Sequence, residues 1–196
     1  SGFDSALSAT NNVWVASGTY SANPGNTIKY NSPSFGGFTA GASYSLHEKV
    51  AGKSSVTDVS LSYAAGPVAI NGAYQVQSPQ GAGLNTKVTT VNGSYDLGVA
   101  KLLAGYARTD AAGTKSTDYQ FGADVPLSSA LTLSAGYARS KTAATGVKSS
   151  GWGIALGYAL SKRTTVYGGF RDSNTKTAGV TTKDTNLYAV GLRHTF

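Results

Sequence analysis

The feature that most constrains this chain is a strict alternation of large apolar residues with small or polar ones. In the segment GWGIALGYAL, glycine and alanine fill one face of the predicted element. The large residues share the opposite face: Trp152, Ile154, Leu156, Tyr158 and Leu160. A period of two residues predicts a β-strand, because successive side chains of a strand point to opposite faces.

The same alternation recurs from residue 26 to the C-terminus and predicts a train of eleven strands. Turn residues separate the strands, and the connections alternate between short and long, as in an up-and-down meander of antiparallel hairpins. Residues 1–25 lack sustained alternation, so we expect a long irregular loop there. The strands are predicted at residues 26–32, 37–46, 55–65, 67–77, 87–97, 99–109, 117–127, 130–140, 150–160, 163–172 and 186–196.

Two all-β architectures show such alternation, a soluble sandwich and a transmembrane barrel. A sandwich strand pairs its apolar face with a solvated face rich in charged residues. Here the second faces carry Gly, Ser, Ala, Asn and Gln, and only 13% of the residues are charged. Tyrosines lie near both ends of the predicted strands, like the aromatic girdles of membrane barrels. The pattern therefore favours an antiparallel up-and-down transmembrane β-barrel.

Composition excludes several other classes of function. The chain has no cysteine, which excludes disulfides and thiolate metal sites. Its two histidines, His47 and His194, are far apart in sequence and lack an evident catalytic partner, so we expect no enzyme, no metal site and no cofactor. The net charge of +7 favours anions, but the basic residues are scattered, unlike those of a nucleic-acid groove. A barrel acting as a receptor, adhesin or structural protein remains the alternative to an open pore.

Three segments resemble the general porins of the Gram-negative outer membrane, especially the beta-proteobacterial branch. They are NTIKYNSPSFGGFTAGASYSL (26–46), LGYALSKRTTVYGGF (156–170) and YAVGLRHTF (188–196). The resemblance implies a passive diffusion channel for ions and small hydrophilic solutes, built as a homotrimer of 16-stranded barrels. It also implies that residues 26–196 are the C-terminal part of one barrel and residues 1–25 the tail of the loop that narrows the lumen.

The resemblance covers only the last eleven strands of such a barrel. The first and last predicted strands run in the same direction, and an odd number of strands cannot close an ordinary antiparallel barrel. Strand edges left unpaired in lipid cost on the order of several kcal/mol per unsatisfied group. We therefore expect the missing N-terminal strands to come from the same or another chain. In the family, the terminal aromatic strand is read by the assembly machinery, which implies this role for Tyr188 and Phe196.

A pore acts through the size and charge of its lumen. The alternation predicts inward-facing acids at Asp58, Asp96, Asp118 and Asp124, and inward-facing bases at Lys29, Lys101, Arg163, Arg171 and Arg193.

Among these bases, Lys29, Arg171 and Arg193 are the preferred candidates for a wall that attracts small anions and gives mild anion selectivity. The alternative for Arg163 and Arg193 is a position at the periplasmic mouth, in bulk water.

Other residues are assigned by the resemblance or by the outward face. The resemblance suggests that Asp4, Ser5 and Ser8 belong to the constriction loop. Arg108 and Arg139 each follow Gly-Tyr-Ala in a predicted strand, two positions after a tyrosine of the outward face, and are therefore predicted to lie on that same face. We expect them to contact lipopolysaccharide phosphates, with phospholipid along the rest of that face. A solvated arginine above the aromatic girdle is the alternative.

Overall fold

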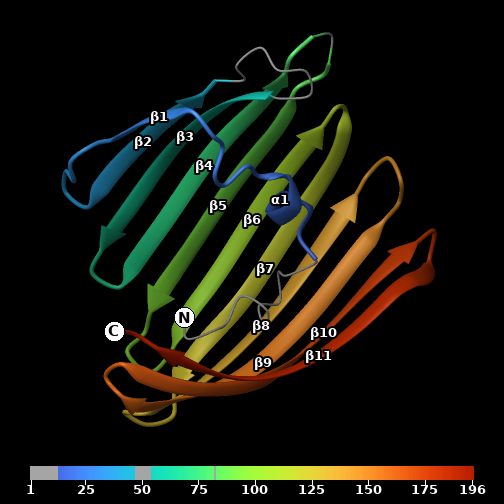
Figure 1. The fold of residues 1–196 in the computed structure, drawn as a ribbon. Helices are drawn as coiled ribbons and strands as arrows, with labels where there is room; N and C mark the ends of the chain where they lie inside the picture. The colour runs from blue at the N-terminus through green and yellow to red at the C-terminus, as the bar shows by residue number, and fades with distance from the viewer. Residues whose placement is uncertain (1–12, 47–53, 82) are drawn as a thin grey trace.

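A computed structural model describes residues 13–46, 54–81 and 83–196 as one antiparallel sheet with its strands in sequence order (Figure 1). This confirms the predicted meander. The elements are α1 (Val15–Thr19), β1 (Thr27–Asn31), β2 (Phe38–Ser45), β3 (Ser54–Ala65), β4 (Val68–Pro79), β5 (Thr86–Asp96), β6 (Lys101–Ala111), β7 (Thr114–Pro126), β8 (Leu131–Thr142), β9 (Lys148–Ser161), β10 (Thr164–Thr177) and β11 (Val180–His194). In these ranges, no helix is long and apolar enough to cross a membrane.

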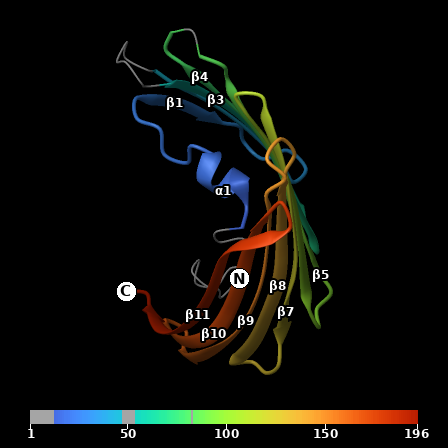
Figure 2. The ribbon, with the colours of Figure 1, turned by 90° about the vertical axis from the view of Figure 1, so that its right-hand side faces the viewer.

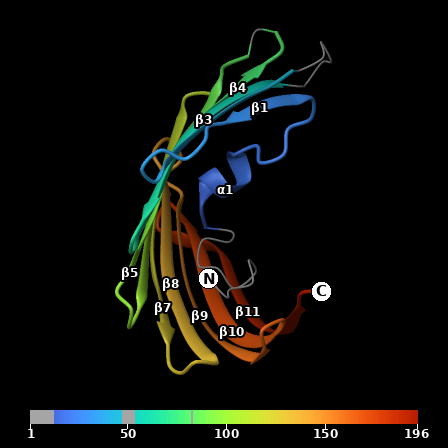
Figure 3. The ribbon, with the colours of Figure 1, turned by 90° about the vertical axis from the view of Figure 1, so that its left-hand side faces the viewer.

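The sheet curves into an arc with a concave and a convex face (Figures 2 and 3). The large apolar side chains stand on the convex face, where many are strongly exposed, among them Leu61, Phe121, Leu156 and Val190. Glycine, serine, alanine and polar residues alternate with them on the concave face. The sheet is therefore inside out relative to a soluble protein, because its apolar side faces outward.

The two ends of the arc are open strand edges. β1 pairs with β2 and β11 pairs with β10, and within the described residues neither has a second partner strand. Each consecutive pair is antiparallel, so β1 and β11 run in the same direction. Direct pairing of these two edges would therefore be parallel.

The predicted strand ranges leave one long connection between residues 109 and 117 and another between residues 172 and 186. Both predictions are wrong, because in each case the two strands continue as a hairpin as far as a tight turn. β6 and β7 are joined by Ala112 and Gly113, and β10 and β11 by Ala178 and Gly179. All four residues have positive φ, between 51° and 88°, as a two-residue type I′ turn requires. These strand ends are polar on both faces, so the hydrophobic alternation that marks a strand is lost there.

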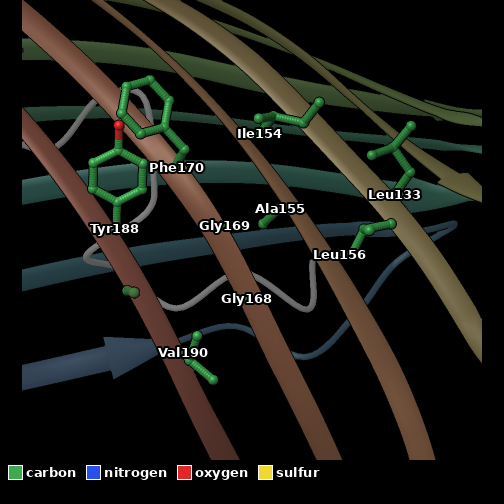
Figure 4. Close-up of a pocket in the computed structure, with 10 residues that line it drawn as sticks. Leu133, Ile154, Ala155, Leu156, Gly168, Gly169, Phe170, Tyr188 and Val190 are labelled. Carbon is green, nitrogen blue, oxygen red and sulfur yellow. The ribbon is translucent and has the colours of Figure 1, made fainter.

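The convex face of β8–β11 carries an apolar pocket of about 430 Å³, shown in Figure 4. It lies where Gly168 contributes no side chain between its register neighbours Leu156 and Val190. The ring of Phe170 packs against Tyr188 on one side, with ring centroids 4.7 Å apart, and against Trp152 on the other, at 5.2 Å. Such a lining suits apolar surroundings better than water.

A short helix lies on the concave face, in a region that the sequence predicted to be irregular. α1 is a little over one turn long, and the N–H of Tyr20 closes its end on the carbonyl oxygen of Ala16 at 2.8 Å. Figures 2 and 3 show α1 and the chain that follows it inside the arc of the sheet. We call residues 13–21 the inward segment.

Candidate functional site

The inward segment is held to the sheet first by apolar packing. Its residues Val13, Trp14 and Ala16 form the buried hydrophobic cluster of the structure with three wall residues: Val88 of β5, Ala107 of β6 and Ala138 of β8. The indole Nε1 of Trp14 donates a hydrogen bond to the backbone carbonyl of Tyr119, 3.1 Å away.

A buried carboxylate makes the second contact. Asp118 of β7 has no exposed surface, and its Oδ2 accepts the backbone N–H of Ala16 at 2.9 Å. A hydrogen bond to a charged group in a buried setting contributes about 1.5–3 kcal/mol. Asp118 therefore fixes the start of α1 on the wall, instead of facing open water.

Two glutamines of β4 hold the end of the inward segment. The amide of Gln75 makes a pair of hydrogen bonds with Ser21, accepting from its N–H at 2.8 Å and donating to its carbonyl oxygen at 3.0 Å. Gln77 donates to the carbonyl oxygen of Thr19 at 2.6 Å. These hydrogen bonds satisfy backbone groups of Thr19 and Ser21, which lie outside the strands and so have no partner in the sheet. The chain is thus tied to the wall where it leaves α1.

Tyr20 links the inward segment to β3. Its hydroxyl donates to Asp58 Oδ2 at 2.6 Å. Burial, followed by the hydrogen bond and the negative charge of Asp58, raises the pKa of Tyr20 to about 12. Tyr20 is consequently neutral at physiological pH and acts as a donor. The segment is anchored on β3, β4 and β7, and it crosses the space between them.

The predicted basic wall residues differ in their surroundings. By strand register, Lys29, Lys101, Arg171 and Arg193 lie on the concave face. Lys29 and Arg193 are exposed, whereas Arg171 is only 4% exposed. Arg163 lies in the two-residue turn between β9 and β10, outside the strand predicted for it, and is exposed. The structure thus does not gather the five bases into one cluster.

The predicted acids fall into two groups. Asp58 and Asp118 lie beneath the inward segment, as described above. Asp96 and Asp124 instead flank Lys101 on the concave face, because Lys101 is the register partner of both. The alternation in the sequence correctly placed all four acids on the same face of the sheet. It could not show which of them contact the inward segment and which lie beside Lys101.

The outward candidates lie on the convex face. Arg108 and Arg139 are exposed there, and Arg139 is the register partner of Tyr119. Tyr188 is 79% exposed, and Phe196 follows the end of β11. Among the remaining candidates, Asp4, Ser5, Ser8 and His47 lie outside the described residues.

Sequence reasoning missed the residues that anchor the segment. Trp14 stands in a stretch without periodicity, and Gln75 and Gln77 resemble any polar residues of an inward face. The signal available was weak: two large amides at alternate positions of one strand, and a tryptophan within a loop. Neither indicates a partner on its own.

The model of the Gram-negative porin family matches residues 1–178. The chain belongs to this family. The resemblance predicted from the three sequence segments is therefore confirmed, as are the outer-membrane location and the transmembrane β-barrel fold. For this porin, the concave face is the lumen side and the convex face is the lipid side. A soluble sandwich is excluded.

Solved structures show the same fold. The porin is 27% identical to an anion-selective porin from Comamonas acidovorans, with a TM-score of 0.72 over 88% of this chain and 60% of that one. OmpT of Vibrio cholerae matches at 16% identity and a TM-score of 0.66, over 86% of this chain and 64% of that one. OccK3 (OpdO) of Pseudomonas aeruginosa matches at 14% identity and a TM-score of 0.65, over 86% of this chain and 55% of that one. A search of curated proteins found no match.

The chain thus spans about 60% of the length of the Comamonas porin.

Proposed function

We propose that this porin is a passive diffusion channel for ions and small hydrophilic solutes, and that it performs no bond chemistry. The observation that supports the proposal is the inward segment, which is anchored on the lumen face inside the arc of the sheet, where it would narrow the space of a closed barrel. A segment that restricts a polar lumen is what a size-selective pore requires. We assign residues 1–25 to the constriction loop, which includes Asp4, Ser5 and Ser8, and residues 26–196 to the barrel wall.

Planar bilayer recording tests this proposal. We expect the complete protein to produce stepwise current increases that are ohmic at low voltage, because a water-filled lumen conducts without gating chemistry. A detergent blank provides the control for leakage. A folded, inserted protein that stays electrically silent would favour the receptor, adhesin or structural alternative.

We infer that strands from outside this sequence complete the wall. The support is the pair of open edges, β1 and β11, which run in the same direction. An even-stranded antiparallel barrel then needs an odd number of further strands, and a 16-stranded barrel needs five. A second copy of these eleven strands in the same membrane orientation would meet them in parallel. We further propose a homotrimer, as the family resemblance implies.

We propose mild anion selectivity, with Lys29, Arg171 and Arg193 as wall residues that attract anions and Lys101 and Arg163 as additional lumen bases. The support is the net charge of +7, the position of four of these bases on the lumen face and the likeness to an anion-selective porin.

Reversal potentials in a potassium chloride gradient test the selectivity. We expect the wild-type potential to carry the sign of chloride preference. Replacing Lys29 or Arg193 with glutamine should lower the chloride-to-potassium permeability ratio about twofold, since each removes one of a few lumen charges. Lys141→Gln, on the lipid face, is the matched control and should leave the ratio unchanged. A cation-selective wild type would overturn the proposal.

We assign lipid contacts to the convex face. Arg108 and Arg139 are proposed to bind lipopolysaccharide phosphates, since both are exposed on the face that carries the tyrosines. The apolar surface of β8–β11 is proposed to contact phospholipid. We propose Tyr188 and Phe196 as the assembly signal, as the family resemblance implies.

A further inference from the structure

The lumen face holds a second feature beside the anchored segment, a polar cavity of about 520 Å³. It lies between residues 20–24, which follow α1, and the wall formed by β1–β4. Its volume is in the range of small-molecule sites, about 300–1,000 Å³. Its lining carries three ionisable groups, Tyr20, Lys29 and Asp58. Tyr20 is neutral, so the cavity presents one positive and one negative charge.

The two charges stand in one cross-strand row. Lys29 of β1 is the register partner of Ser43 of β2, and Ser43 is the register partner of Asp58 of β3. Two interstrand spacings separate their backbones by about 9–10 Å. In the described part of the chain, no ion pair within 4 Å joins Lys29 to Asp58. The cavity therefore keeps its charges apart, with a serine between them.

Each charged group retains capacity for a ligand. The two hydrogen bonds to Asp58, from Tyr20 and from Gln75 Nε2 at 3.4 Å, both end on Oδ2. Within the described ranges, Oδ1 of Asp58 accepts none. Lys29 is exposed, and its ammonium offers three donors. Ser60 and Asn71 add polar groups to the same lining.

We propose that this cavity is a weak binding site for a small zwitterion of the amino-acid class. The solute carboxylate pairs with the ammonium of Lys29, and the solute ammonium pairs with Oδ1 of Asp58. A simple anion matches Lys29 but meets the charge of Asp58, and a simple cation meets the reverse conflict, so only a dipolar solute complements both. This inference rests on the proposed function, because the site is reached through the open lumen.

Block of ion current by β-alanine tests the proposal in planar bilayers containing the complete pore. We expect a saturable reduction of current, with acetate and ethylammonium each requiring at least about a tenfold higher concentration. Lys29→Met and Asp58→Asn should each raise the half-blocking concentration of β-alanine about tenfold or more. The amide oxygen introduced by Asp58→Asn can still accept from the hydroxyl of Tyr20, so this substitution removes the charge and keeps the anchor.

The matched control is a second lysine–aspartate pair of the lumen face. Lys101→Met and Asp124→Asn alter register partners on β6 and β7, outside the cavity, and should leave the β-alanine titration unchanged. If acetate and β-alanine block equally and Asp58→Asn has no effect, the cavity binds anions only, and the proposal of a zwitterion site is overturned. Normal conductance without saturable block would also overturn it, and leave the channel proposal standing. A silent pore would instead overturn the proposed function.

Discussion

Replacing Leu156 with arginine is expected to destabilise the folded barrel of this porin in a bilayer strongly. Leu156 is on β9, is 46% exposed on the convex face and lines the apolar pocket of Figure 4. An arginine at the lipid face near the bilayer midplane costs about 2–4 kcal/mol. The folding equilibrium constant should therefore fall between about 30-fold and 1,000-fold. Urea titration of the protein in phosphatidylcholine vesicles measures this change.

The neighbouring residue supplies the control for Leu156→Arg. Gly157 is next in β9 but faces the lumen, and a Cβ added there would meet only Thr165 Cγ2, at 3.9 Å. Gly157→Arg should therefore fold with a stability close to that of the wild type, since its charge reaches water. Equal destabilisation by both substitutions would mean that the assignment of the two faces is wrong.

Replacing Trp14 with alanine is expected to release the inward segment from the wall. Trp14 is 9% exposed and belongs to one buried cluster with Ala107 and Ala138, and its Nε1 donates a hydrogen bond to the carbonyl of Tyr119. Truncating a buried tryptophan costs about 3–5 kcal/mol. That loss lowers the docking equilibrium constant of the segment by about 100-fold or more. Single-channel conductance should rise, because the released segment no longer occupies one fixed position in the lumen. Current noise should also increase, because the segment moves in the lumen.

The second tryptophan of the chain supplies the comparison. Trp152 lies on the lipid face, is 45% exposed and packs against Phe170. Trp152→Ala should leave conductance and noise as in the wild type. Limited proteolysis gives a second readout, since cleavage within residues 13–21 follows the population of the released state. A Trp14→Ala pore with wild-type conductance and wild-type resistance to cleavage would contradict the anchoring role.

These two experiments address different forces. Leu156→Arg tests the apolar face that keeps the wall in lipid, and its effect is a desolvation cost. Trp14→Ala tests packing between a loop and the lumen side of the wall, and its effect is local. A variant of the first kind changes the stability of the barrel in lipid, and one of the second kind changes how tightly the inward segment is held against the lumen face.

The sequence was sufficient for the wall because its signal is local. Alternation in β9 and β11 follows from the two-residue repeat of the strand backbone, and it places Leu156 and Val190 outward whatever the rest of the chain does. The same reasoning put Lys29 and Arg193 on the lumen face. It failed at the ends of β6 and β10, where both faces are polar and the periodicity vanishes.

The anchoring of the inward segment depends on tertiary contacts that no local pattern encodes. The bonds from Trp14 to Tyr119 and from Tyr20 to Asp58 join residues 105 and 38 positions apart. Alternation within a single strand was enough to predict that Asp58 and Asp118 face inward, because the face of a side chain depends only on its position in its own strand. Whether an inward acid meets water or holds a loop depends on where residues 13–21 cross the arc. The sequence by itself determined the two faces of the wall, and only the tertiary structure decided which lumen residues anchor the segment and which remain open to solutes.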